Sequence, residues 1–128
     1  ASTPAELDKA FEALRRARVD GVAIVPVAKY FNSPREAAHA ALAHRLVTAF
    51  GDLRSVEAGG LMAYTIDWVE TGRQAANYVD RILKGVKPAD LPVEQPRKFE
   101  LVINLKTAKA LGLTIPPSLL LRANQILE

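Results

Sequence analysis

Three helix-start signals, separated by short apolar runs, constrain the fold of this chain most strongly. The segments TPAE, SPRE and DWVE begin at Thr3, Ser33 and Asp67, and each places a capping side chain three residues before a glutamate. The first two segments also put proline at the first helical position, where its missing N–H costs nothing. Apolar residues follow each signal at helical spacing, so each signal predicts a helix. The third of these helices is expected from Asp67 to Lys84.

Short runs rich in apolar and β-branched residues lie between these helices and are bounded by glycine or proline. Such runs predict strands over Gly21–Val27, Leu46–Phe50, Leu61–Thr65 and Phe99–Leu105. Strands this apolar have no wet face, and their alternation with helices is typical of a parallel sheet with right-handed crossovers. The predicted fold class is therefore α/β, with a parallel sheet that carries helices on both faces. Two short helices, separated by TIPP, are expected after the last strand.

Composition limits the kind of protein further. The 128 residues, 49% hydrophobic and 24% charged, suffice for a single domain, so we expect residues 1–128 to form one α/β domain. A formal charge of +3 spread evenly along the chain gives no reason to expect a nucleic-acid partner. Cysteine is absent, which excludes disulfides and thiol chemistry. No targeting segment and no run of membrane-spanning length is recognisable.

Aromatic side chains gather at the predicted carboxyl ends of the strands, which is where open parallel sheets bind ligands. Five of the eight aromatic residues lie there, with polar residues beside them. A small polar ligand with an apolar part would fit such an edge. The alternative is structural, with Phe50 and Tyr64 completing the core and Asn32 and Asp67 capping helices. The candidate ligand-binding residues are Tyr30, Phe31, Asn32, Ser33, Phe50, Asp52, Tyr64, Thr65 and Asp67.

The sequence lacks the motifs that catalytic, cofactor and metal sites require. Dinucleotide, P-loop and nucleophile-elbow motifs are all missing, and so is the strand-end carboxylate of a phospho-acceptor domain. His39 and His44 are five residues apart, so they do not share the helical face that a metal-binding pair needs. The arginines of Leu14–Arg18 suit the end of a helix better than a phosphate site. We therefore predict no enzymatic activity, no cofactor and no metal.

The carboxyl-terminal half, from Asn77 to Glu128, closely resembles the end of a family of bacterial ABC-transporter substrate-binding proteins. Upstream, AGGLMAYTIDWVE (Ala58–Glu70) is similar to a characteristic Ala-Gly-Gly-Leu-Met-Ser-Tyr segment of this family, with Ala63 and Thr65 as departures. The segment Arg18–Glu36 is similar in pattern and looser in its residues. The resemblance thus extends over essentially the whole chain.

This resemblance implies the carboxyl-terminal lobe of a type I periplasmic binding protein, which has a Rossmann-like fold. Members have two lobes that close on a small solute and are about twice this length, so the chain is expected to be a truncated lobe without an export signal. In the family this lobe begins with a strand, a helix and a strand that precede the position of Ser2, and these three elements are expected to be missing. The family takes its solute contacts from the strand-end loops, here those of Tyr30–Ser33, Phe50–Asp52 and Tyr64–Asp67.

Two classes of function follow. The first is a periplasmic solute-binding component that captures a small molecule, such as an amino acid, and delivers it to an ABC permease in the membrane. The alternative is a cytosolic sensory or regulatory ligand-binding domain of the same fold, because a fold does not determine what a site is coupled to. The isolated chain is expected to form a homodimer. It would pair through the Gly21–Val27 edge, through the Asp67–Lys84 helix, or by exchange of that helix.

Overall fold

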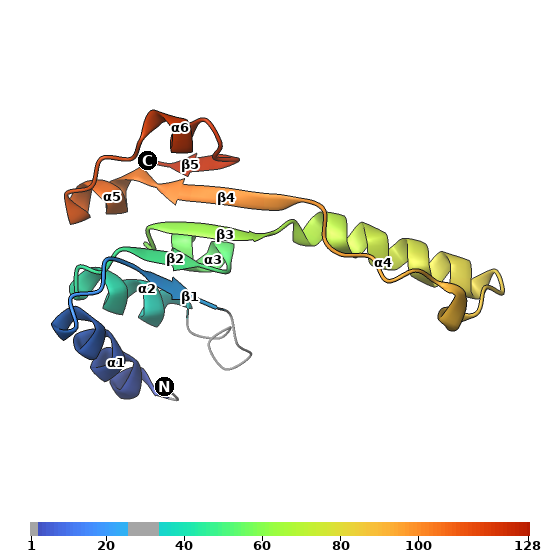
Figure 1. The fold of residues 1–128 in the computed structure, drawn as a ribbon, viewed down its shortest axis with the longest axis horizontal. Coiled ribbons are helices and arrows are strands. Elements are labelled where there is room, and N and C mark those ends of the chain that lie inside the picture. The colour runs from blue at the N-terminus through green and yellow to red at the C-terminus, as the bar shows by residue number, and fades with distance from the viewer. Residues whose placement is uncertain (1–2, 26–33) are drawn as a thin grey trace. The chain divides into compact units, whose positions relative to one another are not determined.

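The computed structural model describes residues 3–25 and 34–128, which divide into two compact units. Residues 1–65 and 100–128 belong to the first unit, and residues 66–99 belong to the second. The elements, in chain order (Figure 1), are α1 (Pro4–Arg16), β1 (Val22–Ile24), α2 (Pro34–Ala43), β2 (Thr48–Phe50), α3 (Leu53–Glu57), β3 (Met62–Ile66), α4 (Trp68–Leu83), the 3-10 helix η1 (Pro88–Asp90), β4 (Phe99–Asn104), α5 (Leu105–Leu111), α6 (Pro117–Leu120) and β5 (Gln125–Leu127).

The five strands form one sheet in the order β1-β2-β3-β4-β5. β1 pairs with β2 in parallel, and β2 pairs with β3 in parallel, which confirms the predicted arrangement of the first three strands. β4 and β5 are also parallel to each other. β4 runs antiparallel to β3 (Figure 1). Accordingly, the N–H of Asn104, at the end of β4, donates to the carbonyl oxygen of Leu61, which precedes β3. The sheet is thus mostly parallel, with one antiparallel step.

One face of the sheet carries the main hydrophobic core. Phe50 and Ala63 lie side by side on this face and are almost completely buried. Phe11 of α1, Ala38 of α2 and Val56 of α3 pack into the same cluster, so these three helices cover the face. Burial of this apolar surface, at about 25 cal/mol per Å², is the main stabilising contribution to the first unit.

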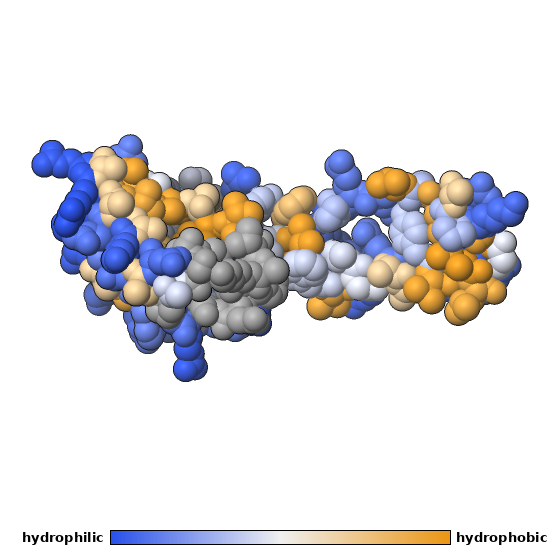
Figure 2. All heavy atoms as spheres, turned by 90° about the horizontal axis from the view of Figure 1, so that it is seen from below, coloured by the Kyte–Doolittle hydropathy of each residue, from blue (hydrophilic) through white to orange (hydrophobic). Residues whose placement is uncertain are grey.

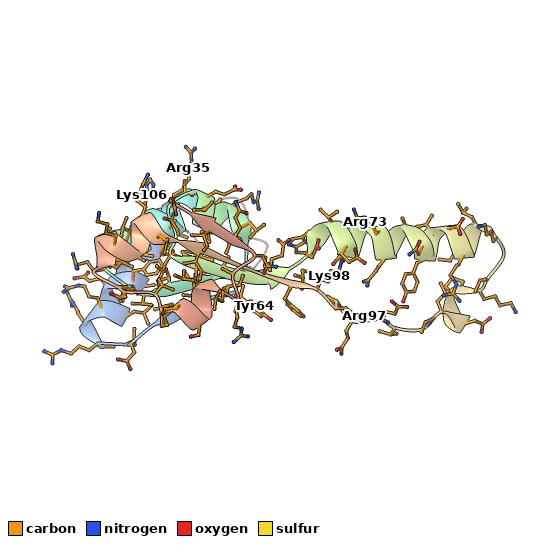
Figure 3. The ribbon with its side chains drawn as sticks, turned by 90° about the horizontal axis from the view of Figure 1, so that it is seen from above. Arg35, Tyr64, Arg73, Arg97, Lys98 and Lys106 are labelled. Atoms are coloured by element: carbon orange, nitrogen blue, oxygen red, sulfur yellow. The ribbon has the colours of Figure 1, made fainter. Side chains whose placement is uncertain are left out.

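The opposite face is covered unevenly. Side chains alternate between faces along a strand, so Ile103, next to the core residue Val102, points to the second face. Ile103 is fully buried, which shows that β4 is covered there. Tyr64 points to the same face from β3 and is 59% exposed, on the side away from α2 (Figure 3). The predicted fold class, α/β with a sheet flanked by helices, is confirmed, but the second face is covered only in part.

The predicted capping residues Thr3 and Asp67 begin α1 and α4. The Oγ1 atom of Thr3 accepts a hydrogen bond from the N–H of Glu6 at 3.2 Å, and Oδ1 of Asp67 accepts one from the N–H of Glu70 at 2.8 Å. Each bond satisfies an N–H group that the helix itself leaves without a partner. The third capping residue, Ser33, lies outside the described residues. α5 and α6 are the two short helices expected around TIPP.

The second unit consists of α4 and a return segment, which we define as residues 88–98. The hydroxyl of Tyr78 donates to the carbonyl oxygen of Pro92, and the N–H of Asp67 donates to the carbonyl oxygen of Lys98 at 3.0 Å. None of the residues of α4, all of which the structure describes, is buried. Within the described ranges, no helix is both long enough and apolar enough to cross a membrane.

Candidate functional site

The carboxyl ends of β1, β2 and β3 meet at one edge of the sheet. Ile24 pairs with Phe50, and Phe50 pairs with Ala63, so the three strands are level at these residues. The N–H of Gly51 donates to the carbonyl oxygen of Ile24 at 3.1 Å, which fixes the start of the loop after β2. This is the edge at which the sequence predicts ligand binding, since loops after parallel strands converge there.

Phe50 and Asp52 have structural partners at this edge. Phe50 is 2% exposed and belongs to the main core. Asp52 caps α3, a helix that the sequence pattern did not predict: its Oδ1 accepts from the N–H of Ser55 at 2.9 Å and its Oδ2 from the hydroxyl of Ser55 at 2.8 Å. The spacing from Asp52 to Ser55 is a capping signal that could have predicted this helix.

Tyr64 and Thr65 lie next to each other near the end of β3 and point to opposite faces. Thr65 is 6% exposed, on the face that α1, α2 and α3 cover, whereas more than half of the Tyr64 side chain is exposed. Among the described candidates in the first unit, Tyr64 therefore offers the largest ring surface to a ligand. A tyrosine ring can stack on an aromatic or apolar group and present its hydroxyl at the same time.

Asp67 belongs to the second unit, where it caps α4. One carboxylate oxygen accepts from the N–H of Glu70, and the carbonyl oxygen of Asp67 accepts from the hydroxyl of Thr71 at 2.9 Å. A second carboxylate oxygen has further acceptor capacity. The remaining candidates, Tyr30, Phe31, Asn32 and Ser33, lie outside the described residues, so their role in ligand binding stays a prediction.

Two pockets lie elsewhere in the first unit. The first, of about 210 Å³, is apolar and lies between α1 and the edge strand β1. The second, of about 390 Å³, lies at the carboxyl ends of β4 and β5 and includes Asn104, Lys106 and Thr107. No described candidate residue lines either pocket. Sequence reasoning did not find the second pocket, because it depends on the reversed direction of β4.

The polar side chains of the second pocket are occupied in holding the fold. The side-chain amide of Asn104 donates to the carbonyl oxygen of Val56 at 3.3 Å, and its oxygen accepts from the N–H of Thr107 at 3.0 Å. The hydroxyl of Thr107 donates to the carbonyl oxygen of Gly59 at 2.8 Å. These bonds join the start of α5 to α3 and to the segment after it, and they give Asn104 and Thr107 a structural role.

His44, at the end of α2, has partners within the fold. His44 lies 2.7 Å from Oδ1 of Asp8 through its Nε2 atom, and its ring stacks on Phe11 with centroids 6.5 Å apart. This side chain therefore joins α2 to α1. Across residues 3–25 and 34–128, no group of three or more potential ligands could hold a metal ion.

Comparisons with known proteins agree with the resemblance seen in the sequence. Residues 6–127 match the family model described as ABC transporter substrate binding protein. A comparison with curated protein sequences finds no match.

Solved structures share the fold. A conserved domain protein from Vibrio cholerae superposes with a TM-score of 0.85 and is 28% identical; the alignment covers 98% of this chain and 42% of that protein. An ABC domain from Streptococcus pneumoniae in complex with L-Trp has a TM-score of 0.81 and 28% identity, and the alignment covers 99% of this chain and 44% of that one. A ligand-free, open substrate-binding protein from Clostridium difficile has a TM-score of 0.71 at 19% identity, covering 99% and 42%. The chain thus spans about two fifths of the length of these proteins.

Proposed function

We propose, since this chain belongs to the ABC transporter substrate-binding protein family, that it contributes to capture of a small solute for delivery to an ABC permease in the membrane. The family match over residues 6–127 is the observation that carries the proposal. Proteins of this family bind a solute and release it unchanged, and they are not enzymes. The permease and a periplasmic location are part of this proposal, because the chain spans only about two fifths of the length of its relatives.

An aromatic amino acid is the solute class that we propose. The pneumococcal relative, at 28% identity, has L-Trp bound. In this chain, Tyr64 exposes its ring at the edge where β1, β2 and β3 end. Offset stacking of two aromatic rings contributes about 0.5–1.5 kcal/mol beyond the area that it buries, enough to favour an aromatic solute over an aliphatic one.

A titration observed by NMR tests this proposal. Addition of L-Trp to the isotope-labelled chain should shift the amide signals of Gly51, Tyr64 and Thr65, and L-Asp should leave them unchanged. Tyr64→Ala should abolish the shifts, and Tyr64→Phe, which keeps the ring, should retain them. The absence of any response to L-Trp, L-Phe and L-Tyr would overturn the proposed solute class. Shifts confined to the Lys106 pocket would overturn the proposed place of binding.

A further inference from the structure

The loop after β2 is fastened by Ser55, a residue of α3 that is 2% exposed. The N–H and the hydroxyl of Ser55 donate to the two carboxylate oxygens of Asp52, at 2.9 Å and 2.8 Å. Its carbonyl oxygen accepts from the N–H of Gly60 at 2.8 Å. All three polar groups of Ser55 thus form hydrogen bonds, and these bonds join the start of α3 to the segment that leads into β3.

The ends of β2 and β3 are packed together at this place. The ring of Phe50, at the end of β2, lies against Gly60, where a Cβ atom would come within 2.7 Å of the ring. Phe50 pairs with Ala63 in the sheet, and Gly51 and Tyr64 follow these two residues directly. The loop after β2 therefore leaves the sheet next to the part of β3 that carries Tyr64, at the edge where we propose that the solute binds.

Gly51 is held from both sides. On one side, its N–H donates to the carbonyl oxygen of Ile24 at 3.1 Å, which ties it to β1. On the other side, the next residue is Asp52, whose carboxylate is bound twice by Ser55. A buried hydrogen bond is lost in full when its donor is removed, because no water replaces it. Removal of the Ser55 hydroxyl should therefore loosen the loop on the side of Asp52.

We propose that Ser55 is a positioning residue of the solute site, which it serves without touching the solute. Its hydroxyl holds Asp52, and Asp52 keeps the main chain of Gly51 in place beside the part of β3 that carries Tyr64. This role rests on the proposed function, because it concerns capture of an aromatic amino acid at the same edge. It needs no surface feature, and the face shown in Figure 2 carries hydrophobic and hydrophilic side chains next to one another.

Amide hydrogen exchange of the solute-free chain, followed by NMR, tests whether Ser55 holds the loop. Ser55→Ala should make the Gly51 amide exchange about 5-fold faster, because local opening then breaks one hydrogen bond fewer. Thr48→Val is the matched control: it removes a hydroxyl of a residue that is also 2% exposed, at the other end of β2, and should leave the Gly51 rate unchanged. An unchanged Gly51 rate in Ser55→Ala would overturn the proposal.

An NMR titration with L-Trp tests whether this position matters for the solute. Ser55→Ala should raise the dissociation constant for L-Trp by about 5-fold, and Thr48→Val should leave it unchanged. The double variant Ser55→Ala/Asp52→Ala should bind L-Trp no more weakly than Asp52→Ala alone, because Ser55 acts only through Asp52. Circular dichroism checks that each variant keeps its helices. If Ser55→Ala does not fold, Asp52→Ala takes its place, since it removes the same two bonds from their other side.

The outcomes separate the role of Ser55 from the proposed function. Equal affinity of Ser55→Ala and the unaltered chain for L-Trp would overturn the role of Ser55 and leave the proposed solute class standing. Losses of Ser55→Ala and Asp52→Ala that simply add in the double variant would do the same. No response of the unaltered chain to L-Trp, L-Phe and L-Tyr would overturn the proposed solute class, and with it the role of Ser55 in binding, even if the Gly51 exchange rate responds.

Discussion

At the scale of single residues, Gly60 has no room for a side chain. A Cβ atom at this position would lie 2.7 Å from the Phe50 ring and 2.7 Å from the carbonyl oxygen of Ser55. Because a backbone oxygen cannot move aside cheaply, Gly60→Ala should lower the free energy of unfolding by about 1–3 kcal/mol. Urea titration followed by circular dichroism measures this. Gly21→Ala is the matched control, since its Cβ would meet its nearest atom at 3.6 Å, and an equal loss there would contradict the argument.

Substitution of Asp52, also at the scale of single residues, distinguishes its role as a helix cap from its predicted role in ligand binding. Its carboxylate accepts two hydrogen bonds from Ser55 at the start of α3. Asp52→Ala should therefore reduce stability by about 1 kcal/mol through the lost cap, whereas Asp52→Asn keeps an acceptor and should lose less. Thermal unfolding in the absence of any solute is the measurement. Unchanged stability of Asp52→Ala would show that the cap contributes little, and would strengthen the interpretation of Asp52 as a solute contact.

At the scale of elements, the joint between α1 and α2 depends more on ring packing than on charge. His44 stacks on Phe11 and its side chain is 17% exposed, whereas the side chain of its polar partner Asp8 is 64% exposed. His44→Ala should cost about 1–2 kcal/mol of stability. Asp8→Ala should cost less than about 1 kcal/mol, because polar contacts of a largely exposed carboxylate contribute little to stability. Chemical denaturation of both variants compares them, and a larger loss for Asp8→Ala would contradict this order.

α4 should be the least protected long helix of the monomer. None of its residues is buried, while β2 and β3 carry core residues on one face. Hydrogen exchange followed by mass spectrometry should therefore show faster exchange in α4 than in β2 at low protein concentration. Protection of α4 should rise with concentration if the helix pairs with a second copy. Equal protection of α4 and β2 in dilute solution would show that α4 has cover within its own chain.

At the scale of the whole molecule, solute affinity should be weak. The chain spans 42–44% of the Vibrio and pneumococcal relatives, and drug-sized ligands are held tightly only when most of their surface is buried. Calorimetry with L-Trp should give a dissociation constant above about 100 μM. Submicromolar binding by a chain that light scattering shows to be monomeric would contradict this expectation, whereas binding that strengthens with dimerisation would implicate the second copy.

The sequence by itself determined the features that depend on neighbours in the chain. Thr3 and Asp67 cap helices because the group that each one binds lies three residues away, and the parallel pairing of β1 with β2 follows from the predicted helix that separates them. The family resemblance was readable too, and the match over residues 6–127 confirms it. The strands are shorter than predicted: the described part of Gly21–Val27 contributes only Val22–Ile24, and Leu46–Phe50 only Thr48–Phe50.

Only the tertiary structure decided the features that join distant segments. β5 is too short to be recognised alone and exists because Gln125–Leu127 pairs with Val102–Asn104. β4 can run opposite to β3 because the chain returns along α4 before β4 begins. The N–H of Asp67, before α4, donates to the carbonyl oxygen of Lys98, just before β4. Likewise, nothing local shows that Phe50 is covered while Tyr64 is exposed, because helices far away in sequence cover one face of the sheet and leave part of the other open. Burial and strand direction are set by contacts across long loops, and no short-range pattern encodes them.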